Sequence, residues 1–259
     1  MEIQFVNITE EEFFRTRLLH KYMPLEYAIK TLKEKKLWFA NPTSWKDPFE
    51  RRFIEAKYKK SRKGRLSSFA WKDRVFCICM TQTITSEAYW NTYSYQQIGI
   101  EFRVNKQQLY DELQKVRGQY DIYIGKVEYM KTSDIKKNPT NSIPFCKPIP
   151  QMNSEEWRAR LLLLKRIAYK YEDEIRIILV KKNRTKEQGV NLEYQCENTD
   201  LIETIVLDPS LADNTTELLK DVFENKYNFR PRQNKNKRYQ RRVLKSQLYA
   251  IQKPQTLTI

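Results

Sequence analysis

Three charged side chains, Glu172, Glu174 and Arg176, alternate along the segment YEDEIRIILV. Alternate side chains of a β-strand share one face, so a strand here places these three in a row, with Asp173 on the opposite, apolar face. Carboxylates at such positions lie about 7 Å apart. The two carboxylates could have different roles in one reaction, one stabilising developing positive charge and the other orienting a nucleophile. The alternative is a solvated strand face whose charges pair weakly with one another and with Lys170.

A second candidate segment is LWFANPTSWKDPFE, which begins at Leu37. Its two prolines interrupt regular structure, and each biases the preceding residue, Asn41 or Asp47, toward extended geometry. The segment is therefore expected to form an ordered loop at a strand end, where binding residues tend to collect. Asn41, Trp45 and Asp47 are its candidates for shaping a ligand pocket. The alternative is a loop whose Trp45 and Phe49 simply cover the edge of the core.

Two further groups of side chains could contact a ligand. His20 and Tyr22 share one face of an expected strand, and Lys21 points to the other. Trp90 and Tyr93 are three residues apart and so share a helix face. These two aromatic residues form either a core stripe or a shelf on which a nucleotide base could stack.

The chain is strongly basic: 48 Lys and Arg against 32 Asp and Glu give a formal charge of +16 over 259 residues. A charge of this size favours polyanionic partners, namely RNA or single-stranded DNA. The basic residues concentrate in two runs, 57–65 and 230–245, in which Tyr58 and Tyr239 could stack on unpaired bases. Either run could also be only a solvated surface. The candidate nucleic-acid-binding residues are Lys59, Lys60, Arg62, Lys63, Arg230, Arg232, Lys237, Arg238, Arg241 and Arg242.

Several classes of site are disfavoured by composition. His20 is the single histidine and the four cysteines lack zinc-site spacing, so no metal site is expected from familiar motifs. Five glycines occur, with no glycine-rich phosphate-binding motif. A divalent-metal nuclease built from Asp47, Glu50, Glu172 and Glu174 remains an alternative. No apolar run reaches about 20 residues and no signal peptide is evident, so we expect a cytoplasmic protein that makes no membrane contact.

The pattern of elements predicts an α+β fold with a mixed or antiparallel split sheet and flanking helices, because strands outnumber long helices and the two do not alternate regularly. The expected strands are 18–23, 37–40, 74–80, 98–104, 122–129, 171–181, 201–207 and 243–251. The expected helices are 24–35, 86–95, 154–169 and 215–227, with loops at 57–65 (or a frayed helix) and 136–152. We expect one domain over 1–259, with a core at about 18–229 and a basic extension from about 230.

The order of these segments resembles a bacterial family known as domain-of-unknown-function family 2971. The resemblance rests on KY at Lys21, LWFANPTSWKDPFE, a cysteine-containing strand, Trp90-x-x-Tyr93 leading into GIEF, EDE-x-R and IETIVLDP. It covers about residues 18–251. The helix shows Tyr-Trp where that family more often shows Met-Trp.

More remotely, the layout is similar to that of DarT-like ADP-ribosyltransferases. That similarity implies an ADP-ribosyltransferase-like core and NAD as substrate, with Glu174 in the catalytic position and Glu172 and Arg176 beside it. It implies NAD contacts from among His20, Lys21, Tyr22, Asn41, Trp45, Asp47, Trp90 and Tyr93. The acceptor would be nucleic acid, and a toxin–antitoxin or phage-defence role would imply a neutralising antitoxin protein. A non-enzymatic nucleic-acid-binding module is the alternative.

Overall fold

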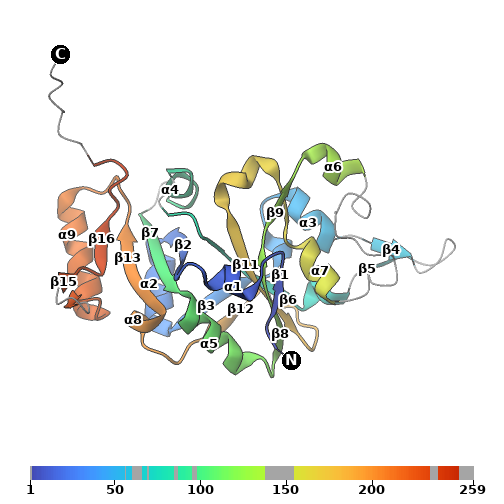
Figure 1. Cartoon of the computed structure of the whole chain (residues 1–259), viewed down its shortest axis with the longest axis horizontal. Helices are drawn as coiled ribbons and strands as arrows, with labels where there is room; N and C mark the ends of the chain where they lie inside the picture. Colours follow the sequence, from blue (N-terminus) through green and yellow to red (C-terminus); the bar gives the residue numbers. More distant parts are fainter. Residues whose placement is uncertain are drawn as a thin grey trace, which may run out of the picture.

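A computed structural model of the chain describes residues 2–55, 57–59, 66–68, 70–84, 87–94, 98–137, 155–233 and 239–250. Its centre is a mixed ten-stranded sheet with helices packed on both faces (Figure 1). The predicted α+β class, with a mixed sheet and flanking helices, is therefore confirmed. No helix in the described ranges has the length and apolar character needed to cross a membrane.

The strands of the large sheet run in the order β1-β8-β11-β6-β2-β7-β13-β16, and β3 links β12 to β6. Their bounds are β1 Gln4–Val6, β2 Leu18–Pro24, β3 Lys36–Ala40, β6 Val75–Thr81, β7 Gly99–Asn105, β8 Tyr120–Lys126, β11 Glu174–Lys181, β12 Gly189–Glu193, β13 Ile202–Leu207 and β16 Val243–Lys245. Three small sheets pair β4 Lys57–Lys59 with β5 Leu66–Ser68, β9 Glu128–Met130 with β10 Leu164–Arg166, and β14 Arg232–Gln233 with β15 Tyr239–Gln240.

The α-helices are short. Their bounds are α1 Glu10–Phe14, α2 Leu25–Glu34, α3 Pro48–Ile54, α4 Glu87–Tyr93, α5 Lys106–Val116, α6 Thr132–Lys137, α7 Glu155–Leu161, α8 Asn198–Leu201 and α9 Asp213–Asp221. The 3-10 turns are η1 Pro42–Ser44, η2 Ala70–Asp73 and η4 Ile167–Glu172, and the π-helical turn η5 Val222–Lys226 continues α9. A capping box between Thr9 and Glu12 begins α1.

The central strands are apolar on both faces because both faces are covered. Ile175, Ile177 and Leu179 of β11 join the main core beneath α2 and α5. Ile178 and Val180 belong to a second core beneath α3 and α7. Continuous apolar runs such as VFCIC and IRIILV are typical of strands buried on both sides. This double cover rigidly holds the residues that project from the ends of β6 and β11.

The segment before β11 differs most from expectation. The helix expected to run to 169 ends at Leu161, and β10 and η4 follow it. The strand expected from 171 starts at Glu174, because Asp173 adopts a left-handed backbone conformation with φ 37°. Asp173 is consequently not on a core-facing strand position, but pairs with Lys126 near the surface. The local cause is a β9–β10 pairing between distant segments, which periodicity cannot detect.

Smaller differences concern element ends. The expected strand 122–129 is divided into β8 and β9, and Pro24 ends β2 rather than forming the first turn of α2. The basic run 57–65 begins as strand β4, not as a loop or helix, and its residues 60–65 lie outside the described residues. Most of the expected loop 136–152 also lies outside them. The final strand is shorter than expected, since β16 ends at Lys245 and pairs in parallel with β13.

Candidate active site

The large sheet divides between β2 and β6. The register of these two strands contains one pair, His20 with Thr81, whereas β2 pairs with β7 along its whole length and β6 with β11 along its own. The ammonium of Lys21 reaches across the divergence and donates to the carbonyl of Cys79 (2.9 Å). A narrow cleft opens beside this split. Its lining residues are His20, Lys21, Tyr22, Cys79, Met80, Tyr89, Tyr93, Glu172 and Glu174.

A buried ion-pair cluster forms the floor of this cleft. Both oxygens of Glu174 accept from the Arg176 guanidinium, at 3.0 Å to Nε and 2.9 Å to Nη2. The same Nη2 donates to Glu50 of α3 at 2.6 Å, and the guanidinium lies 4.3 Å from the centre of the Trp45 ring. Glu174 and Arg176 are 3% and 1% exposed. The solvated-face alternative for this strand is therefore wrong.

Lys165 of β10 joins the two predicted acids. Its Nζ pairs closely with Glu172 and lies 3.2 Å from Glu174 Oε2 and 3.6 Å from Glu50 Oε1. Since Glu172 lies in η4 and not on the strand, its side chain meets that of Glu174 through this shared cation rather than through strand alternation. Three carboxylates thus share two cations in a buried volume, a net charge of about −1 when all five groups are ionised.

The two acids of the cleft are held in different protonation equilibria. Burial alone would raise the pKa of Glu174, but the charges of Arg176 and Lys165 outweigh it and lower the pKa to about 2. Burial and the neighbouring charge of Glu174 raise the pKa of Glu172 to about 7, against the opposing effect of Lys165. An environment that shifts the pKa values of two neighbouring acids in opposite directions is typical of active sites. In such sites one acid serves as a fixed charge and the other as a proton acceptor.

An aromatic wall closes one side of the cleft. The ring of Tyr89 is stacked between Tyr22 (centroids 4.8 Å apart) and Tyr93 (5.8 Å). Trp90 meets Tyr22 edge-on at 5.0 Å. Tyr89 also donates its hydroxyl to the Glu172 carbonyl, which ties α4 to η4. Tyr22, Trp90 and Tyr93, the predicted aromatic contacts, are thus brought together.

A second buried pair lies on β2 and β7. The Nδ1 atom of His20 is 2.7 Å from Glu101 Oε1, and the same oxygen accepts from Arg103 Nε at 3.0 Å. Burial would raise the pKa of Glu101, but the His20 hydrogen bond and the Arg103 charge lower it overall. Burial lowers the pKa of Lys21, and the nearby negative charge of Glu174 partly offsets this effect. Burial and the Glu174 charge raise the pKa of Cys79, so its thiol stays protonated and hydrogen-bonds to Glu174.

The three predicted loop residues do not line this cleft. Asn41 fixes its own loop by donating to the carbonyls of Lys72 (2.8 Å) and Val75 (3.2 Å). Trp45 covers Arg176, as described above. Asp47 caps α3 and pairs with Arg166 at 3.1 Å. Of the three, Trp45 contacts the cluster directly, through Arg176.

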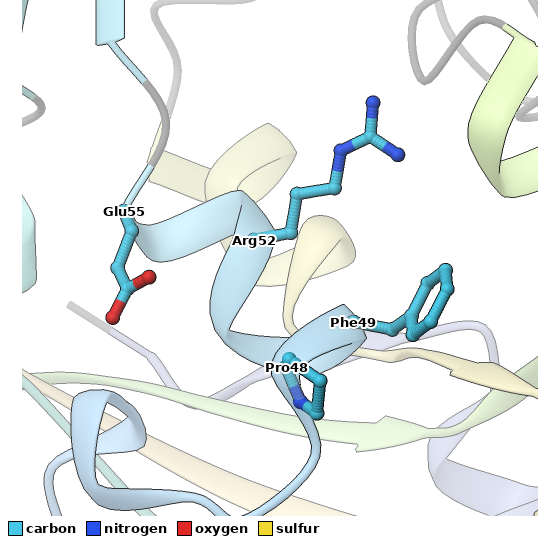
Figure 2. Close-up of a pocket in the computed structure, with 4 residues that line it drawn as sticks. All are labelled: Pro48, Phe49, Arg52 and Glu55. Atoms are coloured by element: carbon cyan, nitrogen blue, oxygen red, sulfur yellow. The ribbon is translucent and has the colours of Figure 1, made fainter.

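Helix α3 also borders a separate hollow. Figure 2 shows this pocket of about 480 Å³, which Pro48, Phe49, Arg52 and Glu55 line. The ring of Phe49 lies 4.6 Å from the Arg166 guanidinium. The hollow shares no lining residue with the cleft beside Glu174.

The predicted nucleic-acid-binding residues lie far from one another. Strand β4, which contains Lys59, is at one end of the long axis of the molecule, and β15 is at the other (Figure 1). Arg230, Arg232 and Arg241 are exposed. Arg242 is buried, and its guanidinium donates to the Glu203 carbonyl (3.1 Å) and to that of Thr199. Five of the candidates lie outside the described residues: Lys60, Arg62, Lys63, Lys237 and Arg238.

Sequence reasoning missed Lys165, Tyr89 and Glu101. Each carried a local signal. Lys165 is a charge directly after four leucines, Tyr89 is four residues before Tyr93, and Glu101 is the one carboxylate within an apolar strand. Their partners could not be assigned, since the Lys165 contacts depend on β10, which was expected to be helix.

The chain matches no protein-family model and no curated protein. Its structure is similar to one of DarT from Thermus sp. 2.9 in complex with ADP-ribosylated ssDNA, at 10% sequence identity and a TM-score of 0.38, covering 93% of this chain and 96% of that one. A likeness at this level assigns neither residue roles nor activity. The resemblance to family 2971 stays a prediction.

Proposed function

We propose that the protein is an NAD-dependent ADP-ribosyltransferase that modifies nucleic acid, either RNA or single-stranded DNA. The observation that carries this proposal is the buried Glu174 carboxylate, held ionised at the floor of an aromatic-lined cleft beside a second acid with a pKa of about 7. Cleavage of a nicotinamide–ribose bond develops positive charge on the ribose ring. A fixed negative charge in a site of low dielectric stabilises such a transition state.

Each of the two acids has a distinct role in this reaction. The bond between ribose C1′ and the nicotinamide nitrogen breaks, and nicotinamide leaves with the electron pair. Arg176, Lys165 and Cys79 already occupy the hydrogen-bonding positions of Glu174, so Glu174 contributes its charge rather than a contact to a ribose hydroxyl. Glu172 accepts the proton that the acceptor atom loses as that atom bonds to C1′.

The size of the cleft limits what it can enclose. Its volume is about 10 Å³, far below the roughly 300–1,000 Å³ of typical small-molecule pockets. The nicotinamide–ribose end of NAD is the part that enters, stacked against Tyr93 or Tyr22, and the aromatic side chains must shift to admit it. The remainder of the dinucleotide lies outside the cleft.

The basic segments at the two ends of the molecule suit a long anionic acceptor. A nucleic-acid strand that touches both β4 and the β14–β15 region would pass along the molecule, and α4 lies between those ends (Figure 1). Tyr89 and Tyr93 of α4 line the cleft. Phosphate contacts of this kind supply affinity without reading sequence. An enzyme that modifies nucleic acid threatens its own cell, which is consistent with a toxin restrained by an antitoxin partner.

The test of the proposed activity is label transfer from NAD. Purified protein is mixed with NAD labelled on the adenylate and, separately, with total RNA, single-stranded DNA or cell protein. We expect label on one nucleic-acid class, release of free nicotinamide, and no effect of a metal chelator. Label on protein alone would contradict the proposed acceptor, and absence of both label and nicotinamide release would contradict the enzyme.

The rate of transfer is expected to depend on pH through Glu172. Its pKa of about 7 means that the proton-accepting form is lost as pH falls, so the rate should drop about tenfold per pH unit below 7 and level off above it. The measurement is a single-turnover rate from about pH 5.5 to about pH 8.5. Glu172→Gln should be slow and insensitive to pH over that range. A flat profile in the unsubstituted protein would remove Glu172 as the base.

A non-enzymatic nucleic-acid-binding module is the second candidate. One observation favours the binding module: protein groups already occupy the hydrogen-bonding positions of Glu174. Buried ion-pair clusters of this kind also serve purely structural roles. It predicts salt-dependent binding of nucleic acid and no interaction with NAD. The nuclease alternative fits less well, because Lys165 stands among Glu50, Glu172 and Glu174, where a divalent ion would have to bind.

A further inference from the structure

A second pocket lies next to helix α4. Tyr89 and Tyr93 line the cleft beside Glu174, whereas Trp90 and Ser94 border this second pocket. Its volume is about 420 Å³, which is within the range of small-molecule sites. The other walls come from the turn that begins with Asp208 after β13 and from Tyr249 after β16. This pocket, called the Asp208 pocket below, shares no lining residue with the cleft.

The charge of the Asp208 pocket is opposite to that of the chain as a whole. The chain has a formal charge of +16, yet the described residues that line this pocket include no lysine or arginine. Asp208 is the charged residue among them; it is 5% exposed and forms no ion pair within the described part of the chain. Burial of a carboxylate without a cation is unfavourable. The pocket therefore suits a ligand that brings a positive charge.

One oxygen of Asp208 is available to such a ligand. Oδ1 already accepts from the backbone nitrogen (2.8 Å) and from the hydroxyl of Ser210, which fixes the side chain in its turn. Oδ2 accepts no hydrogen bond from the described residues, and Ser94 Oγ is buried without a partner among them. These two oxygens converge beside Gly99, where a Cβ would lie 3.1 Å from Oδ2 and 1.8 Å from Ser94 Oγ. A donor with several protons can therefore reach both.

We propose that the Asp208 pocket binds a primary alkylammonium group. The ammonium donates to Asp208 Oδ2 and to Ser94 Oγ, and its charge compensates the buried carboxylate. Tyr249 is half exposed at the pocket and offers its ring to the same charge. The Tyr249 hydroxyl donates to Glu87 Oε1 (3.2 Å), which holds the ring beside α4.

Other ligand classes fit this pocket less well. A guanidinium binds a carboxylate best through two parallel hydrogen bonds, and Ser210 already occupies Oδ1. A calcium ion takes about six to eight oxygen ligands, and the described ranges contain no group of three side chains that could hold a metal ion. A neutral donor can bond to Asp208 Oδ2 but leaves its negative charge uncompensated.

This site goes beyond the proposed transferase and does not depend on it. Because the net charge of the chain repels cations, an ammonium ligand should bind weakly elsewhere on the surface, and binding reports the groups of the pocket. The ammonium could belong to a free polyamine or to a lysine side chain of a polypeptide. The chemistry is the same in both cases, and the experiment separates the two sources.

A ligand-detected NMR titration of the full chain tests the proposal. We expect butylammonium to bind at least about tenfold more tightly than butanol, its neutral analogue, and more tightly than butylguanidinium. Equal binding of butylammonium and butanol would overturn the proposal. Spermidine and Nα-acetyl-lysine amide then identify the source. Tighter binding of spermidine indicates a free polyamine, and tighter binding of the lysine derivative indicates a polypeptide side chain.

Asp208→Asn removes the charge and keeps the shape of the side chain. Its amide oxygen retains the two Ser210 hydrogen bonds, so the amide nitrogen replaces Oδ2 with a donor. We expect butylammonium affinity to fall at least about tenfold. Asp213→Asn is the matched control, because it removes the same charge from an exposed acid that pairs with Lys245 outside the pocket. It should leave binding unchanged.

Unaltered butylammonium binding in Asp208→Asn would overturn the proposal. Ser94→Ala provides a separate test if the first variant does not fold. It removes the second oxygen that the ammonium contacts and should weaken binding about threefold. Unaltered binding in Ser94→Ala would remove the ammonium from the point beside Gly99 and overturn the assignment.

Discussion

Replacing Lys165 with methionine is expected to lower the free energy of unfolding by about 3–5 kcal/mol. The ammonium is nine-tenths buried and contacts Glu172, Glu174 and Glu50, so the substitution leaves three buried carboxylates with the Arg176 guanidinium as their remaining cation. Methionine preserves most of the side-chain volume, and the loss is therefore electrostatic rather than a packing defect. Equilibrium unfolding in urea at neutral pH measures it.

Lys220→Met is the matched control for this loss. Lys220 pairs with Glu217 on the exposed side of α9, and an exposed pair of this kind contributes less than about 1 kcal/mol. The loss in Lys165→Met should also shrink as pH falls. Burial and Glu174 raise the pKa of Glu172 to about 7 although Lys165 opposes the rise, so without Lys165 the pKa of Glu172 lies higher still. On acidification the variant therefore gains more stability from proton binding than the unsubstituted protein does. Equal losses in both variants would show that the cluster is not a strong buried network.

The strands and helices whose apolar residues follow a clear pattern in the sequence were predictable. Continuous apolar runs located β6 and β11, and the helical spacing after Pro24 located α2, because these patterns follow from burial on two faces or one. The sheet order was not predictable, since β3 and β12 enter beside β6 through pairings between residues far apart in the chain. The expected long helix before β11 failed for the same reason: β10 pairs with β9.

The candidate site was predictable by residue type but not by contact. The pattern EDE-x-R correctly indicated that Glu172, Glu174 and Arg176 belong together, although Glu172 reaches the group from η4. No local pattern could show that Lys165 and Glu50 complete the cluster, because both contacts depend on how α3 and β10 pack. Nor could it show that Asn41 and Asp47 hold the loop and α3 instead of facing the cleft.

Glu174→Gln is expected to reduce ADP-ribose transfer by about 10²–10³-fold. This is the usual effect of removing one fixed electrostatic group from a site where transition-state charge develops. The amide keeps the shape of the side chain but removes the negative charge that Arg176 and Lys165 hold ionised in the cleft. Label transfer from NAD and nicotinamide release, both normalised to folded protein, measure the loss. Nucleic-acid binding should persist, since the basic segments lie elsewhere.

Glu50→Gln distinguishes catalysis from support. Glu50 shares Arg176 and Lys165 with Glu174 and is also buried, so its replacement removes one negative charge from the same cluster. It does not line the cleft. We therefore expect a comparable loss of stability in the two variants but a change in transfer of less than about tenfold for Glu50→Gln. If both variants lose transfer equally per folded molecule, Glu174 acts through the structure of the cluster, and the protein is better described as a binding module.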